Sequence, residues 1–241
     1  MLCKTSGVVL NHYRYGESSA IVHIYSKDLG LQSYMVKGAF GRNKKSNFLL
    51  LQPLNIVDMV VYINPRKEIQ TIKEFRPVKI LFRIPFSQSR RAQAFLITEL
   101  LGKVLQNDNG DESLFSFLQN SISVLDSDCC GIENFHIWFI FNLSRYLGFL
   151  PQNNCDDFTS YFDFYEACFV TSQPLHPHYL APSDAIYFKR LFDIDIDHLP
   201  GLASNIHQRR LLLDSVILLY KLHQPAKIQL KSLSVLKELF H

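Results

Sequence analysis

The sequence lacks the patterns that mark secreted and membrane-spanning proteins. Its 5 cysteines are odd in number and irregularly spaced, which argues against a secreted disulfide framework. The longest strongly apolar run, residues 135–143, is about half of the roughly 20 residues that a membrane-spanning helix needs. Residues 1–10 lack the apolar core and cleavage site of a signal peptide. We therefore expect a folded cytoplasmic protein with reduced thiols and no membrane contact.

Acidic residues are absent from Leu29 to Val57, although the whole chain carries 25 Lys+Arg against 22 Asp+Glu. Residues 1–80 contain 12 Lys+Arg and 5 Asp+Glu, a net charge of +7. Residues 81–241 contain 13 and 17, a net charge of −4. This asymmetry favours a polyanionic partner for the N-terminal part, and the plain alternative is a solvated basic surface.

The stretch MVKGAFGRNKKSNF, Met35–Phe48, concentrates the positive charge in one loop that also contains glycine and aromatic residues. Its cations are Lys37, Arg42, Lys44 and Lys45. Lys and Arg neutralise phosphates, and exposed aromatic rings stack on bases of any sequence. Phe40, between two glycines, is the better stacking candidate, because Phe48 precedes an apolar stretch typical of a core. Arg14, between Tyr13 and Tyr15, would extend this DNA-binding patch.

Short strand-like segments fill the first eighty residues. They are GVVLNHYRYG, SSAIVHIYS, LQSYMVKG, LNIVDMVVYIN and EIQTIKEFRPV, and turn signals such as KDLG separate them. Five strands in about 75 residues favour a closed or partly closed barrel, because an open sheet would leave its edges exposed. The sequence predicts an OB-fold over residues 1–79.

Beyond Pro77 the apolar period changes from two to about 3.6, which predicts helices. Three helical segments, the third with Trp138 as a core residue, are followed by an aromatic-rich β excursion at about 151–180 and by further helices. We therefore predict an α+β chain, with an α-helical domain at 80–241 that contains the excursion.

The order and spacing of several stretches resemble the RecO family of bacterial DNA-repair proteins. The resemblance rests on GVVLNHYRYGESSAIVHIYSKDLGLQSYMVKGAFGRNKKS, LQPLNIV, YLGFLP, RRLLLDSVILLYKLH and LKSLSVL. It implies an N-terminal OB-fold, a helical domain and a nonenzymatic recombination mediator. Such a mediator binds and anneals single- and double-stranded DNA in the cytoplasm, at the nucleoid. With RecR, it helps RecA load onto DNA coated by single-stranded DNA-binding protein.

One departure from the family concerns zinc. Many members carry two Cys-x-x-Cys pairs after the helix exit, and four thiolates then hold zinc tetrahedrally. This chain offers only Cys155 and Cys168, and a mixed site with His176 and His178 has weak spacing. We expect a zinc-less variant without cofactors, in which aromatic side chains pack the excursion. These are Phe158, Tyr161, Phe162, Phe164 and Tyr165.

Enzyme chemistry has one candidate, the alternating Asp193, Asp195 and Asp197 of FDIDIDHLP. Paired-metal nucleases need such carboxylates, but no second carboxylate cluster, His-rich motif or phosphate loop accompanies them. GESS at Gly16–Ser19 also lacks the serine nucleophile elbow. We expect a solvated acidic loop and no enzyme activity.

Two further basic groups lie in the predicted helical domain. Arg209 and Arg210 are candidates for DNA, with the solvated face of a helix as the alternative. Arg90, Arg91 and Lys103 are candidates for the acidic, aromatic-ended tail of single-stranded DNA-binding protein, a partner that the family resemblance implies. The alternative function is a non-catalytic OB-fold scaffold that binds proteins and has no significant affinity for DNA.

Overall fold

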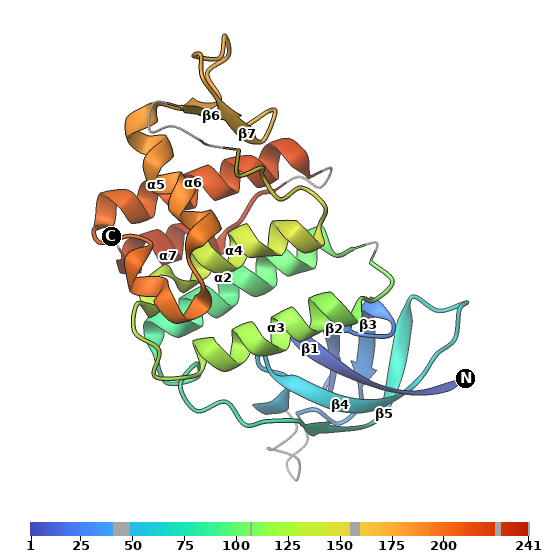
Figure 1. Cartoon of the computed structure of the whole chain (residues 1–241). Coiled ribbons are helices and arrows are strands. Elements are labelled where there is room, and N and C mark those ends of the chain that lie inside the picture. The colour runs from blue at the N-terminus through green and yellow to red at the C-terminus, as the bar shows by residue number, and fades with distance from the viewer. Residues whose placement is uncertain (41–48, 107, 155–159, 225–227, 241) are drawn as a thin grey trace. The chain divides into compact units, whose positions relative to one another are not determined.

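A computed structural model describes residues 1–40, 49–106, 108–154, 160–224 and 228–240 (Figure 1). The chain divides into two compact units, Met1–Asp126 and Ser127–His241. The first unit contains the barrel together with two helices that follow it. A separate domain limited to residues 1–79 stays a prediction.

The first unit begins with a closed five-stranded barrel. Its strands are β1 (Leu2–Tyr15), β2 (Ser19–Ser26), β3 (Gly30–Val36), β4 (Ile56–Tyr62) and β5 (Ile69–Pro77). Their order around the barrel is β1-β2-β3-β5-β4, and β4 also pairs with β1. The pairs are antiparallel except β3–β5, which is parallel. This OB-like barrel confirms the predicted fold class.

The long first strand closes the barrel because it serves two neighbours. Leu2–Val8 pair with β4, and Gly7–Tyr15 pair with β2. The register shifts between Val9 and Asn11, and such a bulge bends a strand and increases its twist. Alternate side chains of the strands fill the interior. Fully buried examples are Val9, Val22, Tyr34, Val57 and Val61.

The β2–β3 turn lies against the connection between the two helices of this unit. Gly30 has φ +63°, and a Cβ placed there would lie 1.9 Å from the carbonyl oxygen of Asp108. The hydroxyl of Tyr25 donates to Asp108 Oδ1 at 3.0 Å and accepts from the backbone N–H of Asp111 at 3.2 Å. These contacts fix the helical connection on the barrel.

The two helices are α2 (Gln88–Val104) and α3 (Glu112–Leu125). Ser87 caps α2 through the N–H of Arg90, as predicted, and Asp111 caps α3. Directly after α3 comes Asp126, a buried carboxylate. It accepts three backbone N–H groups from the segment between β5 and α2, those of Phe82, Arg83 and Ile84, at 2.9, 2.7 and 2.9 Å.

The second unit combines helices with a small sheet. Its helices are α4 (Phe135–Tyr146), α5 (Pro182–Asp193), α6 (Ile206–His223) and α7 (Ser232–Phe240), with 3₁₀ turns η1 (Ile132–Asn134) and η2 (Ile196–Gly201). The strands β6 (Tyr161–Asp163), β7 (Cys168–Val170) and β8 (Tyr179–Leu180) pair in the order β7-β6-β8. This sheet confirms the predicted β excursion.

Helix α4 is buried along most of its length. Trp138 is 9% exposed, and its indole N–H donates to the carbonyl oxygen of Ile194 at 3.1 Å, so it is a core residue. Among the helices that the structure describes, none combines the length and the apolar character needed to cross a bilayer.

Candidate nucleic-acid interface

Arg14 and Phe40 bring a cation and an aromatic ring together at one end of the barrel. The guanidinium group of Arg14 lies 5.5 Å from the centre of the Phe40 ring. It also donates to the carbonyl oxygens of Gly16 and Glu17 at 3.2 and 2.7 Å, so its position is fixed by the β1–β2 turn. The backbone N–H of Phe40 donates to the carbonyl oxygen of Ser18 at 3.0 Å, and this bond joins the same turn to Phe40.

Lys37 follows β3 directly, and its side chain is exposed. We call Arg14, Lys37 and Phe40 the mouth surface. Arg42, Lys44 and Lys45, the other predicted phosphate contacts of this loop, lie outside the described residues. Their place on this surface stays a prediction. The chain nevertheless leaves the mouth surface into this basic stretch, since Phe40 is the last described residue before it.

Two tyrosines extend the exposed aromatic area along β1. Tyr13 and Tyr15 share one face of the strand, Arg14 takes the other, and all three are exposed. Their exposure follows from the pairing, because this part of β1 has β2 as a neighbour but no pairing with β4. The Tyr13 hydroxyl lies 3.2 Å from Nε2 of His23. Burial lowers the pKa of His23, so its ring is neutral at pH 7 and adds no positive charge.

The predicted arginines of α6 belong to the second unit. Arg209 is half-buried and Arg210 is exposed, and both lie in the first turns of a helix that Asn205 caps. They therefore lie apart in the chain from the first unit, which carries the contact between Arg14 and Phe40. Their contribution to DNA binding stays a prediction.

The three predicted partner-binding cations on α2 have different surroundings. Arg90 is half-buried and donates through Nη1 to the carbonyl oxygen of Leu125. Arg91 is exposed, and its Nη1 donates to the carbonyl oxygen of Pro85 at 3.3 Å. Lys103 lies in the last turn, about 18 Å along the axis from Arg91 at 1.5 Å per residue. Partner binding by any of them stays a prediction.

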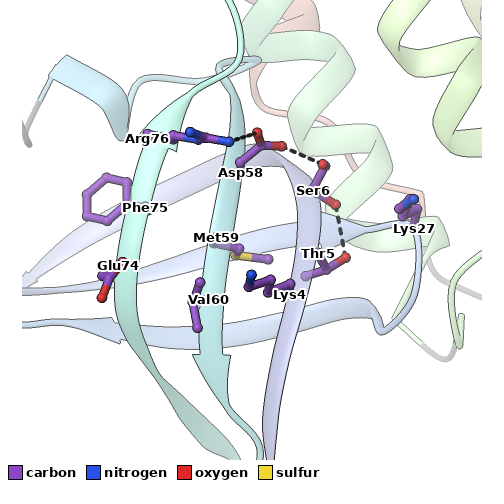
Figure 2. Close-up of a pocket in the computed structure, with 10 residues that line it drawn as sticks. All are labelled: Lys4, Thr5, Ser6, Lys27, Asp58, Met59, Val60, Glu74, Phe75 and Arg76. Atoms are coloured by element: carbon purple, nitrogen blue, oxygen red, sulfur yellow. Dashed lines mark hydrogen bonds and ion pairs between the residues drawn. The ribbon is translucent and has the colours of Figure 1, made fainter.

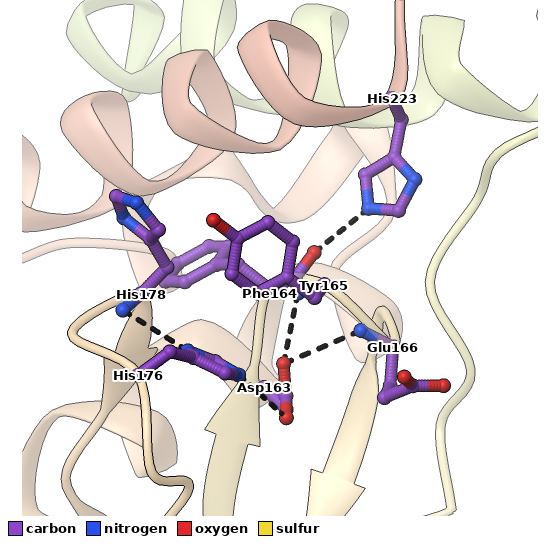
Figure 3. Close-up of polar contacts among 7 residues, drawn as sticks. All are labelled: Asp163, Phe164, Tyr165, Glu166, His176, His178 and His223. Carbon is purple, nitrogen blue, oxygen red and sulfur yellow. Dashed lines mark hydrogen bonds and ion pairs between the residues drawn. The ribbon is translucent and has the colours of Figure 1, made fainter.

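The β excursion contains a polar cluster around His176, one of the candidate zinc ligands (Figure 3). Asp163 accepts the backbone N–H groups of Tyr165 and Glu166 at 2.8 and 3.3 Å. His176 Nε2 donates to Asp163 at 3.1 Å, and His176 Nδ1 accepts the N–H of His178 at 3.2 Å. Both ring nitrogens of His176 are therefore engaged with protein groups and offer no lone pair to a metal.

The other candidate ligands do not complete a zinc site. Burial, with smaller contributions from Asp163 and Glu166, raises the pKa of the Cys168 thiol, whereas zinc needs a thiolate. Cys155 lies outside the described residues. Within the described part of the chain, no three His, Cys, Asp or Glu side chains come together as metal ligands. The described residues of this excursion do not fit tetrahedral zinc.

Aromatic rings pack the excursion, as predicted for Phe162 and Phe164. Both are buried, and the Phe162 ring lies 4.4 Å from the ring of Phe188 on α5. Phe158 lies outside the described residues. The acidic residues of FDIDIDHLP are all exposed. Asp193 ends α5, Asp195 lies in the short extended link that follows, and Asp197 lies in η2, so the three do not share one extended strand.

A pocket on the barrel was not predicted from the sequence (Figure 2). In its lining, Asp58 of β4 accepts the Ser6 hydroxyl at 2.7 Å and pairs with Arg76 at 3.4 Å. The pocket is lined by both positively and negatively charged side chains. Its lining residues are Lys4, Thr5, Ser6, Lys27, Asp58, Met59, Val60, Glu74, Phe75 and Arg76. The signal in the sequence was the single carboxylate within the apolar strand LNIVDMVVYIN.

Comparison with known proteins matches the whole length of the chain. The family models described as recombination protein O N terminal and recombination protein O C terminal match residues 1–81 and 89–234. The DNA repair protein RecO of Phocaeicola vulgatus is 32% identical over 242 residues, and that of Bacteroides fragilis is 32% identical over 243. The DNA repair protein RecO of Porphyromonas gingivalis is 27% identical over 244 residues. Each alignment covers 100% of both chains.

Proposed function

The chain belongs to the RecO family of nonenzymatic DNA-repair proteins, and on this basis we propose that it binds single- and double-stranded DNA and anneals complementary strands. With RecR, it helps RecA load onto DNA coated by single-stranded DNA-binding protein. This activity takes place in the cytoplasm, at the nucleoid.

One observation carries the proposal: the guanidinium of Arg14 lies over the Phe40 ring at the root of the basic loop. The cation neutralises the charge of a phosphate, and the partly exposed ring can stack on a base. Cations on a loop offer charge without the fixed bidentate geometry that reads base edges. The proposed binding is therefore largely independent of DNA sequence.

Gel-shift and annealing assays across a salt series, with and without magnesium, test this function. We expect binding to unrelated sequences with similar affinity, a strong fall in affinity as salt rises, and annealing that needs no magnesium. Arg14→Gln should weaken binding more than Lys67→Gln, a control at an exposed cation in the β4–β5 turn. Absence of binding at low salt would contradict the proposal. Consumption of DNA on addition of magnesium would instead favour the nuclease reading of the Asp193 region.

Protein partners are the second part of the proposal. We assign the acidic tail of single-stranded DNA-binding protein to the region of α2 that carries Arg90, Arg91 and Lys103. Direct titration of a tail peptide into the full-length protein tests this assignment, with Arg91→Ala and Lys103→Ala as variants. Unchanged affinity for the peptide in both variants would contradict the assignment of the tail to α2.

The pocket of mixed charge favours a protein-binding function for the barrel as well. Lys4, Lys27 and Arg76 are accompanied by Asp58 and Glu74, so the pocket offers a polyanion little net attraction. Paired charges of this kind complement a protein surface. Lys4→Glu should weaken RecR binding and leave DNA affinity unchanged. If DNA affinity were negligible while RecR binding persisted, the protein would be the non-catalytic scaffold instead.

A further inference from the structure

The segment between β5 and α2, with the first turns of α2, forms a second basic and aromatic surface. From Phe75 to Thr98 the sequence has no Asp or Glu and has five cations. Three phenylalanines of this stretch are exposed, Phe82 by 68%, Phe86 by 84% and Phe95 by 54%. Exposed rings at this density mark a site of interaction, because soluble proteins bury most of their large aromatic residues.

The backbone that carries these rings is fixed. Leu81 and Ile84 are buried and anchor the segment in the first unit. Asp126 accepts three successive backbone N–H groups. The N–H groups of Phe86 and Ser87 both donate to the carbonyl oxygen of Arg83, at 3.1 and 3.0 Å. Phe82 and Phe86 therefore project from an ordered turn rather than from a loose end. A preformed surface loses little conformational entropy when it binds a ligand.

A cation lies close to the rings. The Arg91 guanidinium reaches the carbonyl oxygen of Pro85, the residue before Phe86. Phe95 lies one turn after Arg91 on the same face of α2. Lys79 and Arg83 are also exposed on this stretch. We call Phe82, Phe86, Phe95 and Arg91 the Phe86 surface.

We propose that the Phe86 surface binds a strand of single-stranded nucleic acid, in addition to the strand at the mouth surface. A base has two flat faces and stacks on a ring that projects from a surface, whereas an apolar peptide side chain needs a concave pocket. A ring exposed by 84% is a projection. Three of the five cations, Lys79, Arg83 and Arg91, are exposed, and their charges match the phosphates of such a strand. Of the other two, Arg76 pairs with Asp58 and Arg90 donates to the carbonyl oxygen of Leu125.

A second strand site deepens the proposed annealing function, on which it rests. Annealing brings two single strands together, and one molecule that holds both replaces a search in solution by a local encounter. The first unit offers two sets of exposed rings and cations for this purpose, the mouth surface and the Phe86 surface. Neither set reads base edges, so both accept any sequence.

Leucine substitution separates stacking from general apolar contact. In F82L/F86L/F95L the surface stays apolar and loses its rings, so we expect fewer dT15 strands bound per chain than in the wild type. Loss of a stacked base reduces affinity roughly 5- to 150-fold, so annealing should fall at least about fivefold. Thermal unfolding controls for folding, and the less disruptive F86L keeps the test decisive if the triple variant unfolds. Tyr62→Leu is the matched control, an exposed ring on β4.

A direct readout comes from F86W in the full-length protein. We expect dT15 to quench the new indole fluorescence. Because Arg91 belongs both to this surface and to the region assigned to the acidic tail, an acidic, aromatic-ended peptide should compete with dT15. A response to the peptide alone would overturn the proposal and assign the surface to the protein tail. Unchanged strand number and annealing in a folded leucine variant would also overturn it. If wild-type protein bound no DNA at all, the proposed function itself would fail, and the second site with it.

Discussion

Aromatic rings serve different purposes in the two units. In the first unit, exposed or partly exposed rings lie beside cations, as in Phe40 with Arg14 and Phe86 near Arg91. In the second unit, the large rings pack mainly on each other, with centroid distances of 4.4 Å for Phe162–Phe188 and 5.0 Å for Phe141–Phe192. The second unit also has one cation over a ring, since the Arg190 guanidinium lies 5.0 Å from the centre of the Tyr187 ring. Neither the residue type nor a neighbouring cation alone therefore indicates a ligand surface. High exposure of the ring, as for Phe82 and Phe86, is the clearer sign.

The two units fix these rings by the same means. Asp126 and Asp163 are buried carboxylates, and each accepts several hydrogen bonds from a short segment. Asp126 holds the backbone that exposes Phe82, and Asp163 holds the turn after buried Phe162 with the help of His176. One device supports a binding surface in the first unit and a packed core in the second.

The largest expected effect is that of Asp126→Ala. The substitution leaves the N–H groups of Phe82, Arg83 and Ile84 without their acceptor, and an unsatisfied buried donor costs about 1–3 kcal/mol. We expect the free energy of unfolding to fall by about 3 kcal/mol or more in urea denaturation. Asp126→Asn should lose less, because it keeps Oδ1 as an acceptor for two of the three groups.

Glu112→Ala is the matched control for Asp126, because its carboxylate is exposed at the start of the same helix. It should cost about 0.5 kcal/mol. The Asp126→Ala protein should also lose second-strand binding at temperatures where it remains folded, since the ordered turn of the Phe86 surface loosens. Equal stability of the Asp126→Ala and Glu112→Ala proteins would show that the carboxylate does not organise this segment.

The next effect is that of Asp163→Ala in the second unit. It removes the acceptor of two backbone N–H groups and of His176, so we expect a loss of about 2–3 kcal/mol in the free energy of unfolding. Glu166→Ala, an exposed neighbour, should change stability by less than about 0.5 kcal/mol.

Metal removal sharpens the same comparison. Chelation should leave the unfolding curve unchanged, because hydrogen bonds rather than zinc close the excursion. A structural zinc would contribute directly to folding, so a chelator would then destabilise the second unit. Elemental analysis that found close to one equivalent of tightly held zinc would contradict this prediction.

Strand alternation and turn signals were enough to predict the barrel, because each strand has a buried and an exposed face. Helical spacing also predicted the helices, and Phe95 lies at that spacing among the apolar positions of α2. The structure leaves Phe95 54% exposed. The hydrophobic period predicts which face of a helix is apolar, but it does not predict how much of that face the neighbouring elements bury. The exposed position of Phe95 was therefore not predictable from the sequence.

The polar contacts were beyond the reach of sequence patterns. Asp126 binds residues about 43 positions earlier in the chain, and His176 binds Asp163 across 13 positions. Neither separation belongs to a helical or strand period, and only the tertiary fold brings these groups together. The mouth surface was partly predictable, because its charge is local in sequence, but the contact between Arg14 and Phe40 depends on the pairing of both β1 and β3 with β2.

A smaller effect, on binding rather than folding, is expected from the basic loop. Replacing Arg42, Lys44 and Lys45 with Gln should flatten the plot of log K against log salt by roughly two, since each phosphate contact contributes about 0.7 for single strands or 0.9 for duplex. The control removes three barrel cations elsewhere, with Arg66, Lys67 and Lys73 changed to Gln. A similar loss of slope in the control would mean that net charge matters and the position of the loop does not.

The smallest effect is expected from Arg210→Gln on α6. The mouth surface and the Phe86 surface both belong to the first unit, whereas Arg210 lies in the second. Its neighbour Arg209 is half-buried, so at most one of the two side chains extends fully to a phosphate. The salt slope should change by less than about one, and annealing should stay near the wild-type rate. Lys221→Gln, an exposed cation near the other end of α6, is the matched control. If Arg210→Gln flattened the slope as much as the triple loop variant, the main DNA surface would lie on the second unit, and the contrast between the two units would fail.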